Sequence, residues 1–323
     1  MVQELPYYAY SEYLKDKYGE KVYKLPVNLP VSCPNRLTGR GCAFCSEKGA
    51  GFEAMDCRVP VKEQLKKTRQ RIETKYHARK FIAYFQNYTN TFLPLTQFCS
   101  YVDEAAGVQD VVELAISTRP DCISLEYLEA LLDVRRRYGS NITIELGLQT
   151  SNYHTLMRMN RGHTLAEFID AVLAVQAYGF EVCAHVILNL PNDELSDTIE
   201  TAKILSALRV QTVKAHSLYL AKGTALCDAY ERGEVTICSK EEYLKRLASF
   251  LDYLSPKIGV ERLFSRIPFD DAIFCNWGTS WWKLRDELLE YMREKGSFQG
   301  RKFHYLNGSA LKQMQRTKEQ EAF

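Results

Sequence analysis

The stretch Cys33-Pro-Asn-Arg-Leu-Thr-Gly-Arg-Gly-Cys42-Ala-Phe-Cys45 follows an apolar extended run and decides how the rest of the chain is interpreted. Eight residues separate Cys33 from Cys42, and two separate Cys42 from Cys45. Gly39 and Gly41 allow the tight turns that would wrap three thiolates around one face of a cubane iron–sulfur cluster. Three thiolates leave one iron without a protein ligand, and such an iron can bind a small molecule. The motif therefore predicts a cluster that activates a small molecule.

A structural zinc site is the main alternative for this motif. Zinc would need a fourth Cys or His ligand, and the nearby candidate, Cys57, lies alone twelve residues after Cys45. A chance spacing of three buried cysteines is a second alternative. It fits poorly with the Gly and Arg residues of the loop, because core cysteines usually lie within apolar runs.

The composition is that of a globular protein. With 323 residues and 46% hydrophobic content, the chain can form one large domain, with or without an extension. Lys and Arg number 42 and Asp and Glu number 40, so a nucleic-acid surface would need local segregation of charge. No apolar run reaches the roughly 18 to 20 residues that span a bilayer, and the N-terminus has no export pattern, so we expect a cytoplasmic protein without disulfides. Five further cysteines lie in apolar or mixed stretches, and we expect most of them to be ordinary buried thiols. They are Cys99, Cys122, Cys183, Cys227 and Cys238.

Apolar runs alternate with helical patterns along most of the chain. Strands are predicted at 22–31, 80–86, 111–117, 142–149, 181–190 and 211–220, and helices at 6–20, 61–80, 96–106, 124–138, 164–178 and 195–208. Strands about 30 residues apart with intervening helices indicate a parallel α/β sheet, and six of them suggest a partial barrel. A doubly wound sheet competes, but it would usually carry a Gly-rich phosphate loop where this chain has cysteines.

Polar residues follow the predicted strands at their carboxyl ends. These segments are Gln86–Thr91, Ser117–Asp121, Gln149–Ser151, His185–Glu194 and His216–Tyr219. Each alone could be a turn or a cap. Because functional residues of parallel α/β folds gather at the carboxyl ends of the strands, five such segments together favour a site at that end.

With these motifs in this order, residues 20 to 260 resemble the radical S-adenosylmethionine enzymes, and more narrowly the YhcC/YtqA group, which is related to the catalytic subunit of Elongator. The first gap between the cysteines is longer than the commonest one, as in the Elongator-like branch. The resemblance implies a radical SAM partial (β/α)6 TIM-like barrel, here over 21–256, between an N-terminal helical segment at 1–20 and a C-terminal extension at 257–323. It also implies a [4Fe-4S] cluster on Cys33, Cys42 and Cys45, S-adenosylmethionine, and an electron donor such as flavodoxin or ferredoxin.

The resemblance extends to the residues that contact S-adenosylmethionine. Phe44 matches the aromatic residue beside the adenine, and Ser117 and Arg119 match positions at the methionine moiety. The segment Gln86-Asn87-Tyr88-Thr89 stands where the family usually has Gly-Gly-Glu or Gly-Gly-Thr, whose role is to contact the methionine amino group.

Four further positions complete this set. Gln149 and Arg161 match a pair in which the glutamine holds the ribose and the arginine holds the methionine carboxylate. His185 matches a ribose contact and Ile187 an apolar contact to the adenine, whereas Asn189 replaces the usual Gly. Arg161 as a surface helix cap and His185 as a satisfied core histidine are the alternatives.

Two basic regions bear on the substrate. The predicted helix at 62–80 carries eight Lys or Arg against two Glu, and basic residues alternate with aromatic ones over 281–316. This pattern suits RNA phosphates and unpaired bases, although a solvated helix and a packed tail would show it too. The resemblance implies tRNA, not DNA or a membrane, with conversion of 5-carboxymethylaminomethyl-uridine (or its 2-thio form) to 5-aminomethyl-uridine at the wobble position of the anticodon loop. A small-molecule or porphyrin-like substrate and a non-catalytic iron–sulfur RNA-binding or sensor protein are the alternatives, and Cys275 is either a hydrogen-atom donor or a buried structural thiol.

Overall fold

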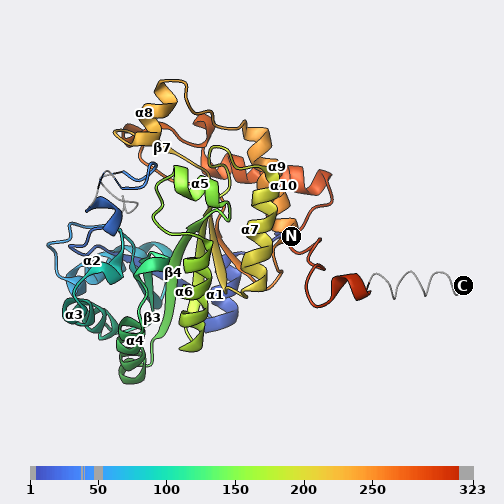
Figure 1. Cartoon of the computed structure of the whole chain (residues 1–323). Coiled ribbons are helices and arrows are strands. Elements are labelled where there is room, and N and C mark those ends of the chain that lie inside the picture. The colour runs from blue at the N-terminus through green and yellow to red at the C-terminus, as the bar shows by residue number, and fades with distance from the viewer. Residues whose placement is uncertain (1–4, 38, 40, 47–53, 313–323) are drawn as a thin grey trace, which may run out of the picture.

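A parallel sheet of seven strands forms the centre of the protein in the computed structural model, which describes residues 5–37, 39, 41–46 and 54–312 (Figure 1). The strands run in the order β1-β2-β3-β4-β5-β6-β8. Their bounds are β1 Val22–Val27, β2 Lys80–Phe85, β3 Val111–Thr118, β4 Asn141–Gln149, β5 Glu181–Ile187, β6 Thr212–His216 and β8 Gly259–Arg262. Since each strand pairs with the next along the sheet, the order never reverses, and the doubly wound alternative is excluded.

Helices cover the outside of this curled sheet (Figure 1). Those that connect consecutive strands are α2 Val61–Tyr76, α3 Leu95–Ala106, α4 Leu125–Tyr138, α6 Leu165–Ala177 and α7 Leu195–Ala207. They pack on outward-facing apolar residues such as Leu25, Phe85 and Ile116, all fully buried. The predicted α/β partial barrel is therefore confirmed.

The central sheet has one strand more than the six that the sequence predicted. The four-residue strand β8 pairs in parallel with β6 and extends the sheet beyond residue 256. In addition, the run predicted as one strand at 211–220 divides into β6 and the short β7, Leu220–Ala221, which pairs antiparallel with β9, Ala272–Phe274. A strand of four residues is too short to leave a clear periodic signal.

The edges of the sheet are joined by the N-terminal segment. Helix α1, Tyr10–Tyr18, contacts both β1 and β8, and Ala9 forms a parallel bridge with Val260. Inside the sheet, Lys17 reaches the carboxylates of Glu113 and Glu181, each at 2.7 Å. Helix α1 therefore closes the amino-terminal end of the half barrel.

The region after β6 adds helices that the periodicity did not predict. They are α8 Ala225–Glu231, α9 Lys240–Tyr253 and α10 Trp281–Glu294, while the short α5, Tyr153–Arg158, follows β4. Helix α10 buries Leu284, Leu288 and Met292, and Arg301 pairs with the carboxylate of Asp252 at 2.6 Å. Part of the basic and aromatic C-terminal region is thus packed on the body of the protein. No helix of the described residues has the length and apolar character of a membrane span.

Candidate active site

The cysteine loop lies at the carboxyl end of β1 and is tied down by side chains within and beyond it. The amide of Asn35 donates to the Asn160 and Arg161 carbonyls, at 2.7 and 3.0 Å, and the guanidinium of Arg36 donates to the Ser46 carbonyl at 2.5 Å. The Ala43 N–H donates to the Met159 carbonyl at 2.9 Å. These bonds fix the loop against the turn that follows α5.

Hydrogen-bond donors surround the three sulfurs. Nη1 of Arg161 lies 3.3 Å from Cys42 Sγ, and Nδ2 of Asn35 also lies 3.3 Å from it. Arg119 lies 3.9 Å from Cys33 Sγ, and Arg36 lies 3.9 Å from Cys45 Sγ. Cationic donors favour the thiolate, which is the metal-binding form of cysteine, but at Cys45 burial and the neighbouring Cys42 outweigh them and raise the pKa of the thiol.

The arrangement of possible metal ligands bears on the zinc alternative. In a tetrahedral zinc site with Zn–S bonds of about 2.3 Å, the sulfurs lie about 3.8 Å apart. Among the described residues, the group of three metal-binding side chains whose ligand atoms lie within 4.8 Å of one another is Glu145, Cys183 and His185, not the three motif cysteines. The motif cysteines do not form so compact a group here, and this open arrangement is compatible with a cubane, whose ligands sit on separate irons.

An irregularity in β4 brings two predicted residues together. The pairing of β4 with β5 shifts between Gly147 and Gln149, and Gln149 has φ 76°. Nη2 of Arg161 donates to the Gly147 carbonyl at 3.0 Å. A Cβ at Gly147 would lie 2.5 Å from Arg161 Nη2 and 2.7 Å from Gln149 Nε2, so this position must be glycine for both side chains to approach.

Most of the predicted site residues line one cavity of about 180 Å³ at this end of the sheet. They are Cys33, Cys42, Phe44, Cys45, Gln86, Tyr88, Thr89, Ser117, Arg119, Gln149, Arg161 and His185. Asn87 does not line the cavity, because its amide turns to the Asn28 side chain, at 2.8 Å. Ile187 lies just outside it, in an apolar cluster against which Phe44 packs.

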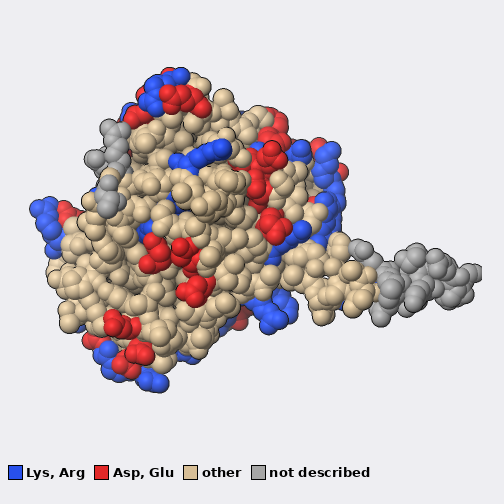
Figure 2. All heavy atoms as spheres, viewed as in Figure 1, with Lys and Arg blue, Asp and Glu red and all other residues tan. Residues whose placement is uncertain are grey.

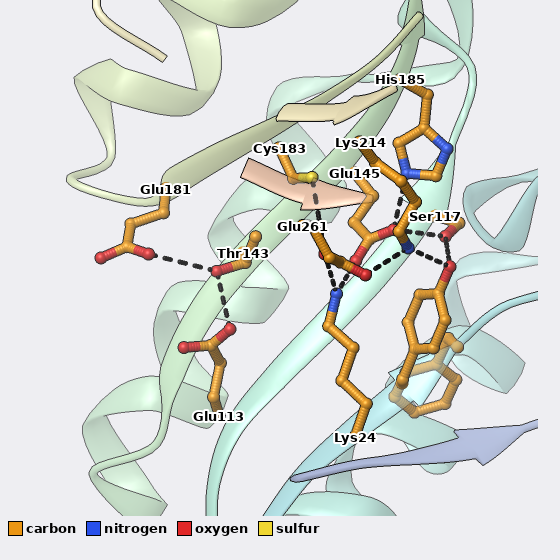
Figure 3. Close-up of polar contacts among 12 residues, drawn as sticks. Lys24, Glu113, Ser117, Thr143, Glu145, Glu181, Cys183, His185, Lys214 and Glu261 are labelled. Atoms are coloured by element: carbon orange, nitrogen blue, oxygen red, sulfur yellow. Dashed lines mark hydrogen bonds and ion pairs between the residues drawn. The ribbon is translucent and has the colours of Figure 1, made fainter. Parts of the chain in front are cut away.

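The floor of the cavity is a network of buried ion pairs (Figure 3). Lys24 contacts Glu145 and Glu261 at 2.5 Å each, and Lys214 contacts the same two carboxylates at 3.1 and 2.7 Å. Burial alone would raise the pKa of Glu145, but the two ammonium groups outweigh it and hold that pKa well below its usual range. The two Lys and two Glu therefore balance one another.

His185 joins this network from β5. Its Nε2 lies 2.7 Å from Glu145 Oε2. Burial lowers the pKa of His185, and the neighbouring carboxylate only partly opposes this, so the ring is neutral at pH 7. One ring nitrogen of His185 is therefore hydrogen-bonded within the protein, as the core-histidine alternative expects. The side chain also lines the cavity, as the cofactor-contact prediction expects.

Comparison with known proteins agrees with this arrangement. Residues 27–205 match the model of the Radical SAM superfamily, and residues 210–294 match that of the Radical_SAM C-terminal domain. The chain belongs to the radical SAM superfamily. It is 34% identical over 297 residues to an uncharacterised protein of Methanocaldococcus jannaschii, covering 91% of each chain, and 31% identical over 306 residues to YtqA of Bacillus subtilis, covering 94% of each.

A solved structure shows the same fold. It is the archaeal Methanocaldococcus infernus Elp3 with residues 1–46 deleted, which has a TM-score of 0.67 and 17% identity, over 85% of this chain and 63% of that chain. The likeness shows the shared fold, and the 31% identity to YtqA places the chain in the radical SAM group that includes YtqA. The cofactors of the superfamily are a [4Fe-4S] cluster and S-adenosylmethionine.

The residues of the cavity fit both cofactors. Three cysteine sulfurs face it, and Nε of Arg161 is buried without a hydrogen-bond partner among the described residues. A buried donor of this kind is costly unless a ligand accepts from it, and a carboxylate is a suitable acceptor.

Several residues in or beside the cofactor cavity, the cavity of about 180 Å³ at the carboxyl ends of the strands, were not identified from the sequence. Asn35 and Arg36 lie inside the cysteine motif, and Gly147 is a glycine within a strand, which is a known sign of a close backbone approach. Further lining residues that the sequence did not identify are Tyr84, Glu145, Lys214 and Arg262, whereas His216 and Tyr219 belong to a polar strand end that it did identify. Glu145 and Lys214 are charged residues within apolar runs predicted as strands, and this pattern could have identified them.

A second cavity, of about 650 Å³, adjoins the first and shares Gln86 and Arg262 with it. Its other walls come from the C-terminal region, including Phe274, Trp281 and Trp282. Cys275 lines this larger cavity and not the cofactor cavity, and burial raises the pKa of its thiol to about 11, so the S–H is retained at pH 7. Cys57 does not line either cavity.

Proposed function

We propose that this radical SAM enzyme modifies the wobble uridine of tRNA, converting 5-carboxymethylaminomethyl-uridine, or its 2-thio form, to 5-aminomethyl-uridine. The observation that carries the proposal is the larger cavity, which opens beside the cofactor cavity and is lined by aromatic and basic side chains. The likeness to Elp3 in fold, and the resemblance of the sequence motifs to the Elongator-related group, support an RNA substrate.

In this proposal Cys33, Cys42 and Cys45 hold the cluster. When bound, the cluster and S-adenosylmethionine supply a 5′-deoxyadenosyl radical, which removes a hydrogen atom from the substrate. Arg161 binds the methionine carboxylate through its buried Nε, beside Cys42. The remaining contacts come from Ser117 and Arg119 to the methionine moiety, from Gln86, Tyr88 and Thr89 to its amino group, from Gln149 and His185 to the ribose, and from Phe44 and Ile187 to the adenine.

The ion pairs bear on how the substrate enters. Lys24, Glu145, Lys214 and Glu261 lie below the cofactor cavity and separate it from a third cavity, of about 640 Å³, that Lys24 and Glu261 line from the other side. The larger cavity directly adjoins the cofactor cavity, and it is the entry that we assign to the substrate. A single unpaired base from an anticodon loop suits this entry, because little energy is needed to extrude it from a stack.

The aromatic residues of this cavity suit a nucleobase. Trp281 lies with its ring 4.1 Å from the guanidinium carbon of Arg266, and Trp282 beside it is more than half exposed. Lys and Arg lie at the edge of the molecule where α10 lies (Figures 1 and 2), and the helix carries Lys283, Arg285 and Arg293, interspersed with four acidic residues. Aromatic faces beside basic side chains are the pattern that stacks unpaired bases and contacts phosphates.

The test is a direct assay of the nucleoside. Enzyme with a reconstituted cluster is incubated with S-adenosylmethionine, dithionite and tRNA that carries 5-carboxymethylaminomethyl-uridine, and the nucleosides are analysed by mass spectrometry. We expect the mass of 5-aminomethyl-uridine to appear, and a Cys33→Ala variant to lose both this product and the cluster absorbance near about 400 nm. An unchanged nucleoside alongside deoxyadenosine formation would contradict the proposed substrate and favour a small molecule.

Deoxyadenosine formation also separates the enzyme from a non-catalytic RNA-binding protein. A cluster that forms without any cleavage of S-adenosylmethionine would support the non-catalytic alternative. The cytoplasmic location and the flavodoxin- or ferredoxin-type electron donor stay predictions from the sequence.

A further inference from the structure

A bulge in β8 directs two neighbouring side chains to the same side of the sheet. Val213 pairs with Val260 and Lys214 pairs with Arg262, so Glu261 is an extra residue in β8. In a regular strand, Glu261 and Arg262 would point to opposite faces. Here Glu261 reaches the ion pairs of the floor and Arg262 lines the cofactor cavity above them. Bulges beside active sites commonly re-aim a side chain in this way.

Glu261 does not neutralise the charge of its neighbour, Arg262. Its Oε1 is 2.7 Å from Lys214 and its Oε2 is 2.5 Å from Lys24, so both oxygens are already paired with ammonium groups. Within the described ranges, Arg262 has no ion pair and its guanidinium makes no hydrogen bond. The positive charge of Arg262 also acts on His216, because burial first and then Arg262 lower the pKa of that histidine.

The other arginines near the cofactor cavity differ from Arg262. Arg119 pairs with Asp121 at 2.6 Å, and Arg161 donates to the Gly147 carbonyl at 3.0 Å. Arg262 is also placed differently, because it lies where the cofactor cavity, the larger cavity and a third cavity of about 640 Å³ meet. An uncompensated cation therefore stands where the reacting part of a substrate would meet the cofactor.

We propose that Arg262 binds a carboxylate on the substrate, next to the carbon from which hydrogen is removed. The inference rests on the proposed function, since the substituent of 5-carboxymethylaminomethyl-uridine ends in such a carboxylate. A guanidinium can hold a carboxylate with two parallel hydrogen bonds, which fixes both its distance and its orientation. The base itself lies in the larger cavity, against Trp281.

The experiment compares three tRNAs that differ only at the wobble position. They carry 5-carboxymethylaminomethyl-uridine, 5-aminomethyl-uridine or unmodified uridine, and their dissociation constants are measured at one salt concentration. The enzyme holds its cluster and S-adenosylmethionine but no reductant, so no turnover occurs. We expect the wild type to bind the carboxylate-bearing tRNA roughly 10-fold or more tightly than the other two, as for a charge-assisted hydrogen bond.

Two arginine variants test which residue produces the preference for the carboxylate-bearing tRNA. Arg262→Gln should abolish it while leaving the affinity for S-adenosylmethionine unchanged. Arg266→Gln removes the same charge from the larger cavity without touching the cofactor cavity, and it should weaken all three tRNAs alike.

Four results would overturn the assignment. A wild type that does not prefer the carboxylate has no such subsite. Retention of the preference in Arg262→Gln excludes this residue, equal weakening of all three tRNAs by Arg262→Gln indicates a phosphate contact, and loss of affinity for S-adenosylmethionine indicates a cofactor contact.

The nucleoside assay keeps this inference separate from the proposed function. Conversion of the nucleoside by the wild type, with the binding preference retained in Arg262→Gln, would refute the role of Arg262 and leave the function intact. A preference that depends on Arg262, without any conversion, would support the carboxylate site and refute the reaction.

Discussion

The floor of the half barrel and the cofactor cavity above it are both rich in cations, but they use them differently. In the floor, Lys24 and Lys214 each contact the same two carboxylates. In the cavity, Arg161 faces a cysteine sulfur and keeps a buried donor without a partner among the described residues, and Arg262 has no counter-charge there. Paired charges stabilise the shape of the interior, whereas unpaired donors mark where ligands bind.

Removing one cation from the ion-pair network in the floor should have the largest effect on the free energy of unfolding. Lys214→Met removes one ammonium group and leaves Glu145 and Glu261 with Lys24 alone. Because a buried carboxylate would lose its counter-charge, we expect the free energy of unfolding to fall by about 3 to 5 kcal/mol in urea denaturation.

Two controls define that result. Lys67→Met breaks an exposed pair with Glu63 and should cost less than about 0.5 kcal/mol. Combining Lys214→Met with Glu261→Leu rebalances the charge and should recover more than half of the loss. A double variant no more stable than the single one would show that packing, not charge balance, is what Lys214 provides.

Breaking the cavity should affect ligand binding more than stability. Arg161→Met removes the buried guanidinium beside Cys42. The dissociation constant of S-adenosylmethionine should rise about 10- to 100-fold, as expected for loss of a charged hydrogen bond, with the cluster absorbance retained. The exposed Arg158 on α5 is the matched control, and Arg158→Met should bind like the wild type. Equal effects of the two variants would contradict the assignment of Arg161.

Gly147→Ala sharpens the same comparison without removing any charge. The added Cβ would meet Arg161 and Gln149 at less than 3 Å, so both side chains must move. We expect the affinity for S-adenosylmethionine to fall roughly 10-fold, measured by isothermal titration. Gly107→Ala, where a Cβ meets its nearest neighbour at 3.4 Å and the φ is −75°, is the control and should bind normally. Wild-type affinity in Gly147→Ala would show that the close approach is not needed.

The smallest effect concerns His163, in the turn that follows Arg161. Burial first and then the charge of Arg161 lower the pKa of His163 to about 4, against about 6.5 in the unfolded chain. Between these values the unfolded chain binds more protons, so the free energy of unfolding falls as the pH falls. From pH 7.5 to 5.5 His163 should contribute a loss of about 1 kcal/mol, which His163→Gln should remove from the pH dependence in urea denaturation. Identical pH dependence in the two proteins would contradict a neutral, buried His163.

The sequence predicted the parts of this molecule that depend on local pattern. The cysteine spacing and the polar ends of the strands predicted most of the residues that line the cavity of about 180 Å³, because consecutive parallel strands bring their carboxyl ends together. Strand β8 was missed because it is short and its bulge breaks the alternation of side chains. Arg262 was missed for the same reason, and the balance of Lys24 with Glu261 depends on residues more than 200 positions apart, which no local pattern reveals.

The bridge between Ala9 and Val260 has a consequence for synthesis of the chain. The Tyr8 N–H donates to the side chain of Gln299, 291 residues later, and the Gln299 N–H donates to the Pro6 carbonyl, each at 2.8 Å. The segment around Tyr8 therefore reaches its final position only after the chain has been made as far as Gln299. Until then the edges of the sheet are not joined through this segment, and nascent chains at this stage should be the most exposed to aggregation.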